Sequence, residues 1–77
     1  MNVVLPSLAA GMEVGTVLTW LKREGESVRE GEPIVEVEAD KANHELEAPA
    51  SGTLVEIRAA EGDEVPVGGV LAVIEPA

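Results

Sequence analysis

The 77-residue sequence contains no cysteine, no phenylalanine and no tyrosine, and Trp20 is its only tryptophan. Without cysteine, neither a disulfide framework nor a thiolate metal site can stabilise the fold. No apolar run approaches the roughly 20 residues that span a bilayer. A chain of this length predicts one small domain, residues 1–77, whose core must come from twelve Val, seven Leu and three Ile.

Positive charge is also scarce, because five Lys and Arg face fifteen Asp and Glu and leave a formal net charge of −10. Such a surface repels the phosphates of nucleic acids and the headgroups of anionic lipids. We therefore expect neither a nucleic acid nor a membrane as a partner. Acidity of this degree favours protein partners with basic docking surfaces.

What the sequence does contain is an internal repeat. Residues 15–38 align with residues 52–75 without a gap at an offset of 37, and turn glycines recur in register. Recurring turn signals between Val-rich segments predict an all-β sandwich or barrel with approximate two-fold symmetry and no helix. The identical pairs are Gly15/Gly52, Thr16/Thr53, Glu24/Glu61, Gly25/Gly62, Val28/Val65, Gly31/Gly68 and Glu38/Glu75.

The same alignment predicts which side chains face the core in the first strand of each half. Leu18 and Trp20 align with the apolar residues Val55 and Ile57, whereas Thr19 lies between them. Because successive side chains of a strand point to opposite faces, the even positions of the first half should face inward. Trp20 is then a core residue and not a platform for stacking a ligand.

A single lysine, Lys41, lies in an acidic stretch in which apolar and polar residues alternate on both sides. Both flanks read as amphipathic strands, and only Asp40 and Lys41 separate them, which predicts a two-residue hairpin. The offset of 37 residues maps Lys41 to position 78, just past the last residue. Because the two halves are related by approximate two-fold symmetry, the turn at Lys41 and the chain termini should lie at opposite ends of the molecule. The acids are Glu36, Glu38, Asp40, Glu45 and Glu47, and the residues expected to face inward are Val35, Val37, Ala39, Ala42, His44, Leu46 and Ala48.

The chemistry of Lys41 follows from these neighbours. Nearby carboxylates favour the charged ammonium, whereas a nucleophilic lysine needs desolvation or another cation beside it. Lys41 is therefore a poor catalyst and an accessible target for an enzyme that modifies lysine. His44 is expected to be a partly buried histidine at a sheet edge, because no second His and no Cys exist to build a relay or a metal site.

With "EVEADKA" and the duplicated "EG..V..G" pattern in view, the chain resembles the lipoyl domains of 2-oxo acid dehydrogenase acyltransferase components, within the biotinyl/lipoyl-attachment family. The resemblance implies a flattened barrel of two four-stranded antiparallel sheets related by a pseudo-two-fold axis. It also implies that Lys41 carries lipoic acid in amide linkage, with Asp40 and Ala42 recognised by the lipoyl ligase.

The resemblance further implies a swinging arm and a set of partners. The arm would be acylated by a thiamine-diphosphate-dependent decarboxylase, serve the acyltransferase core that acylates coenzyme A, and be reoxidised by dihydrolipoamide dehydrogenase. The chain would be a monomeric carrier and not an enzyme, the N-terminal domain of a longer protein with a Pro/Ala-rich linker starting near residue 76. Its compartment would be the cytoplasm, or the mitochondrial matrix in a eukaryote.

Four alternatives fit the residues less well. A biotinyl carrier usually has "AMKM", and here Asp40 and Ala42 replace both methionines. A glycine-cleavage carrier is usually longer, and the unmodified lipoyl-like domains of export adaptors are typically inserted in long helical hairpins. An autonomous enzyme lacks support because the chain has one His, no Cys and no phosphate-cradling glycine loop. Pyruvate, branched-chain, 2-oxoglutarate and acetoin complexes all stay open.

Overall fold

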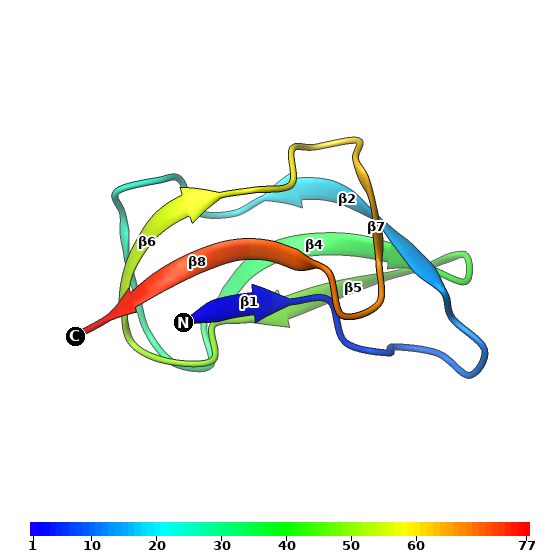
Figure 1. Ribbon diagram of the computed structural model, residues 1–77, viewed down its shortest axis with the longest axis horizontal. Coiled ribbons are helices and arrows are strands. Elements are labelled where there is room, and N and C mark those ends of the chain that lie inside the picture. Colours follow the sequence, from blue (N-terminus) through cyan, green and yellow to red (C-terminus); the bar gives the residue numbers. More distant parts are fainter.

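The computed structural model describes all residues 1–77 as a sandwich of two four-stranded antiparallel sheets, with no helix (Figure 1). The strand order is β1-β8-β6-β3 in one sheet and β5-β4-β2-β7 in the other. No helix of the chain is long and apolar enough to cross a membrane. The fold class predicted from the sequence is confirmed. The strands are β1 Asn2–Val4, β2 Val14–Trp20, β3 Ser27–Val28, β4 Pro33–Ala39, β5 Ala42–Glu47, β6 Gly52–Ile57, β7 Glu64–Pro66 and β8 Val70–Pro76.

The repeat is present in the backbone as well as in the sequence. Strands β2, β3 and β4 correspond to β6, β7 and β8, and β5 flanks β4 as β1 flanks β8. Gly25 and Gly62 have the same φ of +92°, and their N–H groups donate to Leu54 and Val17 oxygens at 2.7 Å. Only glycine adopts this left-handed backbone without strain. The glycine pairs of the repeat therefore mark equivalent turns.

A β-bulge in the first strand of each half corrects the predicted facing of side chains. The register shifts between Val17 and Thr19, and again between Leu54 and Glu56. A bulge adds one residue to a strand and reverses its inward and outward alternation beyond that point. The bulged residues are Leu18, which is half-buried, and Val55, which is 42% exposed. Their predicted inward facing was wrong.

On either side of these bulges, apolar residues do reach the core. Val17 and Leu54 are buried before the bulge, and Trp20 and Ile57 pack against the core after it. Trp20 is half-buried, and its indole Nε1–H donates to the carbonyl oxygen of Ala59 at 2.7 Å. A partly buried tryptophan with its one donor satisfied is an anchor of the core. The core role predicted for Trp20 is confirmed.

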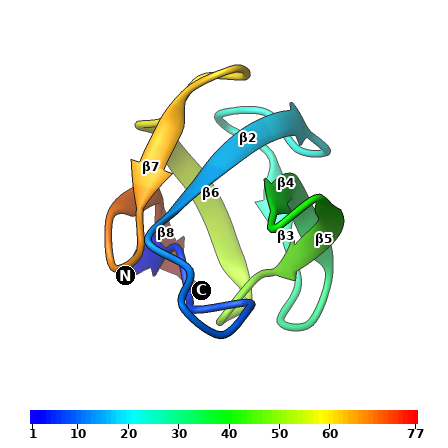
Figure 2. The same cartoon turned by 90° about the vertical axis from the view of Figure 1, so that its right-hand side faces the viewer.

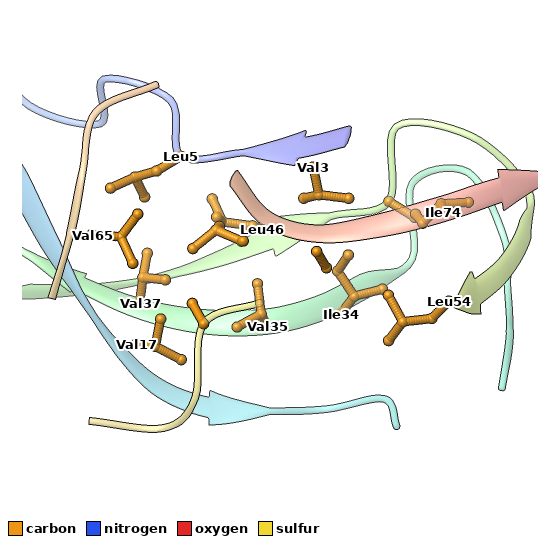
Figure 3. Packing of buried hydrophobic residues seen from close by; sticks show 14 of the residues in the cluster. Val3, Leu5, Val17, Ile34, Val35, Val37, Leu46, Leu54, Val65 and Ile74 are labelled. Carbon is orange, nitrogen blue, oxygen red and sulfur yellow. The ribbon is translucent and has the colours of Figure 1, made fainter. Parts of the chain in front are cut away.

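The hydrophobic core lies between the two sheets and is aliphatic (Figure 3). It contains fifteen buried residues, and Ile34, Leu54, Leu71 and Ile74 have no exposed surface. Figure 3 shows side chains from both sheets pointing toward one another, including Ile34 of β4 and Leu54 of β6. Because no polar side chain is buried, the hydrophobic effect of close-packed Val, Leu and Ile supplies the main stabilisation.

Two glutamates join the halves of the repeat reciprocally. Glu24 accepts a hydrogen bond from the backbone N–H of Ile57 at 2.7 Å, and Glu61 accepts one from the N–H of Trp20 at 2.9 Å. Glu61 also accepts from the hydroxyl of Thr19 at 3.1 Å. Each carboxylate binds the end of the first strand of the opposite half. The identity of Glu24 and Glu61 in the repeat thus has a structural cause.

Candidate functional site

Lys41 lies at the tip of a two-residue hairpin that joins β4 to β5. Ala39 pairs with Ala42, and the turn residues Asp40 and Lys41 have φ angles of 51° and 63°. Positive φ at both central positions is the signature of a type I′ turn, whose twist matches that of the flanking strands. These are the chain's only residues other than glycine with positive φ. The predicted hairpin is confirmed.

The hairpin is held by the buried face of β4. Val35, Val37 and Ala39 are 0, 1 and 2% exposed, and the residues between them turn outward. β4 lies between β5 and β2 and pairs with both, so it is fixed from two sides. A turn built directly on such a strand has little freedom to move relative to the core. The backbone at Lys41 is therefore a firm base for its side chain.

Strand β5 follows the predicted alternation except at its start. Leu46 and Ala48 are buried, and His44 is half-buried opposite Val37, as expected for a histidine at a sheet edge. Ala42 is exposed, so its predicted inward position was wrong. The reason is that β5 is an edge strand, and Ala42 at its beginning has a paired neighbour on one side only.

The ammonium of Lys41 has no partner in the structure. The two ion pairs present join Lys22 to Glu32 and Arg58 to Glu56, and no side-chain hydrogen bond involves Lys41. The residue is exposed, as are its neighbours Asp40 and Ala42. The amine is thus free to be approached by another protein, while Glu36 and Glu45, which pair across the two strands, keep the sheet beneath it acidic.

The hairpin and the chain termini occupy opposite parts of the molecule, as predicted. Figure 1 shows the β4–β5 turn at one end of the long axis and the C-terminus at the other, with the N-terminus displaced toward the C-terminal end. That axis measures 34 Å. Figure 2 looks along it from the hairpin end and shows β4 and β5 on the side of the sandwich away from β7. A chain attached at Ala77 would leave the Lys41 tip unobstructed.

Comparison with known proteins agrees with this geometry. The family model described as "Biotin-requiring enzyme", which covers biotin- and lipoyl-attachment domains, matches residues 1–74. The solution structure of the lipoyl domain of the 2-oxoglutarate dehydrogenase complex from Azotobacter vinelandii superposes with a TM-score of 0.81 at 37% identity, covering 100% of this chain and 99% of that one. The chain belongs to the biotin/lipoyl-attachment family and, within it, to the lipoyl domains.

Two longer relatives come from acyltransferase components. The dihydrolipoyllysine-residue acetyltransferase component of the pyruvate dehydrogenase complex of Mycobacterium bovis is 49% identical over 70 residues, which are 91% of this chain and 13% of that protein. The succinyltransferase component of the 2-oxoglutarate dehydrogenase complex of Staphylococcus saprophyticus is 47% identical over 73 residues, 95% of this chain and 17% of that protein. The chain therefore spans less than a fifth of these relatives, and the biotinyl alternative has less support than the lipoyl one.

Proposed function

We propose that this chain is a carrier domain whose Lys41 bears lipoic acid, joined by an amide between the lipoyl carboxyl group and Nζ. The observation that carries the proposal is the free, exposed ammonium of Lys41 at the tip of a type I′ hairpin, in a chain that belongs to the lipoyl domains. Asp40 and Ala42, on either side, are the residues that the modifying ligase would read.

The residues at the tip fit such a group. An amide at Nζ removes one positive charge and needs no counter-ion, and no carboxylate ion pair of Lys41 has to be broken to form it. When bound, lipoic acid supplies a dithiolane disulfide that accepts two electrons together with an acyl group and later returns to the disulfide. The protein contributes the fixed turn, the exposed position and the acidic surroundings.

Modification of Lys41 would make the hairpin tip more acidic. Lys41 is the only cation in residues 36–47, which also contain five carboxylates. Amide formation would change the formal charge of this segment from −4 to −5. A partner that docks at the tip would therefore present basic residues, and opposite charge would raise its rate of association.

The proposed partners follow from the relatives, which are components of 2-oxo acid dehydrogenase complexes. They are a thiamine-diphosphate-dependent decarboxylase, the acyltransferase core that acylates coenzyme A, and dihydrolipoamide dehydrogenase. On this proposal the chain performs no catalysis itself and is one domain of a longer acyltransferase component, since it matches less than a fifth of such relatives. Its compartment would be the cytoplasm or the mitochondrial matrix. The proposal leaves the particular 2-oxo acid open, since the relatives serve different acids.

The proposal is tested by intact mass after incubation with lipoyl ligase or with biotin ligase. We expect a lipoyl shift on the unaltered chain, no shift on Lys41→Arg, and a full shift on Lys22→Arg, which changes another lysine in the same way. A biotinyl shift in place of a lipoyl one, or an unmodified Lys41, would overturn the assignment.

The neighbours of Lys41 allow a second test. We expect the double substitution Asp40→Met and Ala42→Met to raise biotinylation and lower lipoylation, because both side chains flank the modified amine and are exposed to the ligase. Unchanged modification by both ligases would show that recognition lies elsewhere on the domain.

A further inference from the structure

A groove of about 400 Å³ runs between the edges of the two sheets, on the flank of the sandwich. One wall comes from β1 and the turn after it, and the other from β5 and the turn after it. Because β1 and β5 end different sheets and do not pair, the sandwich is open here. Figure 1 shows the two strands running along the same flank. The lining residues are Asn2, Val3, Val4 and Pro6 on one wall, and Glu45, Leu46, Glu47 and Pro49 on the other.

Main-chain groups on the β5 wall have no strand to bond. Antiparallel pairing alternates, so residues whose N–H and C=O face the partner strand are followed by residues whose groups face away. Ala42 closes the hairpin opposite Ala39, and Ala48 donates to Glu32, which places the even residues of β5 toward β4. Asn43, Glu45 and Glu47 therefore direct their N–H and C=O groups away from the sheet.

The β1 wall is open in the same way. The backbone of Met1 exchanges both hydrogen bonds with Ile74, at 2.7 and 2.8 Å, so the groups of Asn2 face away from β8. The side chains of the β1 wall are uncharged, and Val4 is 45% exposed. On this wall the chain offers apolar surface, whereas the opposite wall offers carboxylates.

Glu45 and Glu47 give the groove its charge. They are two residues apart on one strand, so their side chains share one face, and both are exposed. Neither takes part in an ion pair, and the cross-strand neighbour of Glu45 is another acid, Glu36. Like charges directly opposite each other destabilise a sheet, so a cation placed here would relieve repulsion as well as gain attraction.

We propose that the β5 wall of this groove binds an extended segment of a partner protein in which basic residues alternate with apolar ones. The segment would pair with the outward main-chain groups of β5, the β-strand addition used by many peptide-binding domains. Its basic side chains would lie over Glu45 and Glu47, and its apolar side chains would point toward Val3 and Leu46 on the groove floor.

This surface is separate from the Lys41 tip. Glu45 lies four residues along β5 from Lys41, which corresponds to about 13 Å at the rise of a strand. Binding in the groove would not need the lipoyl group and would hold a partner while the tip stays free. A second copy of this chain is a poor occupant, because pairing two β5 edges would bring the acids of both copies together.

The test uses the unmodified domain, labelled with ¹⁵N, and a synthetic capped peptide of about eight residues in which lysine and valine alternate. We expect peptide-dependent shifts of the amide signals of Asn43, Glu45 and Glu47, together with slower hydrogen exchange at those three amides. A peptide of the same composition with the lysines grouped in one block is expected to bind at least fivefold more weakly, because its charges do not match the spacing of the two acids.

Variants and a modified peptide separate pairing from charge. Glu45→Gln with Glu47→Gln is expected to weaken binding by about fivefold to tenfold, the effect of two exposed ion pairs, whereas Glu30→Gln with Glu64→Gln makes the same change in net charge and leaves binding within about twofold. An alternating peptide that is N-methylated at every residue keeps its charge but has no N–H to donate from either edge, and it is expected to lose binding.

Three outcomes would overturn the proposal. The first is the absence of shifts in β5 amides at millimolar peptide. The second is equal binding by the N-methylated peptide, which would mean attraction by charge alone. The third is a concentration-dependent dimer that forms through β5 and excludes the peptide. Because the domain carries no lipoyl group in this test, none of these outcomes bears on the modification of Lys41.

Discussion

Gly52 and Gly15 are equivalent in the repeat, yet alanine is expected to be far more harmful at Gly52. A Cβ on Gly52 would overlap the carbonyl oxygen of Glu75 and lie 2.8 Å from the Cα of Pro76, both in the backbone of β8. A Cβ on Gly15 would meet the ends of two flexible side chains, Met12 Cε at 3.1 Å and Leu5 Cδ2 at 3.2 Å. Neither glycine has a left-handed φ, so the difference is one of space alone.

The magnitude follows from what must move. To relieve the overlap, the end of β8 must leave β6 where Gly52 pairs with Pro76, and the bond from the Ala77 N–H to the Ser51 oxygen, at 3.0 Å, would be lost with it. At about 1 kcal/mol for each of two or three lost interactions, Gly52→Ala should cost about 2–3 kcal/mol. Gly15→Ala should cost less than about 1 kcal/mol, because side-chain ends can shift. The total free energy of unfolding of a domain of this size is roughly 4–12 kcal/mol, so a loss of this order at Gly52 is easily measured.

Urea unfolding followed by circular dichroism measures the difference. With a slope of about 1 kcal/mol/M, the midpoint of Gly52→Ala should fall by about 2–3 M and that of Gly15→Ala by less than about 1 M. Amide exchange at Ala77 should quicken in Gly52→Ala only. Equal losses for the two variants, or a loss below about 0.5 kcal/mol at Gly52, would refute the steric reasoning.

Three further predictions concern the joined halves, the tryptophan and the turn. Glu61→Ala and Glu24→Ala should each lower the free energy of unfolding by about 1 kcal/mol, and the loss should be larger for Glu61→Ala because two hydrogen bonds are removed. A larger loss of stability for Glu24→Ala in the same urea assay would contradict this. Trp20→Phe should cost about 1–2 kcal/mol by leaving its acceptor unpaired, and a thermal midpoint unchanged from that of the unaltered chain would count against the bond. Asp40→Val should lower the free energy of unfolding by about 1–2 kcal/mol because a β-branched residue resists positive φ, whereas Asp40→Asn should be neutral. Equal urea midpoints for the Val and Asn variants would show that the turn is not type I′ in solution.

Much of the fold and the position of the candidate site could be predicted because the relevant signals are local or repeated. Alternation on both sides of Asp40 and Lys41 leaves two residues for the turn, and hairpin geometry then determines where the lysine lies. The repeat supplied the approximate symmetry, because glycines that permit positive φ recur at the same spacing. Neither step required knowledge of contacts between distant residues.

The errors have a different physical origin. Leu18 and Val55 each stand beside another apolar residue, Val17 or Leu54, so the letters alone give no indication of which neighbour enters the core. A bulge decides this, and its position depends on pairing with β4 or β8. The hydrogen bonds of Glu24 and Glu61 were missed for a similar reason, because each joins residues more than 30 apart in the chain. The open edge of β5 likewise follows only from the order of strands.

The reciprocal hydrogen bonds of Glu24 and Glu61 also bear on how such a chain arises. Each half carries a carboxylate that accepts a hydrogen bond from the other half and a backbone N–H that donates to the other half's carboxylate, so one half alone would make neither bond. Two copies of a single half would supply each other with what is missing. The structure is thus that of a self-complementary pair of halves joined in one polypeptide, which is the arrangement that duplication of a half-length sequence would produce.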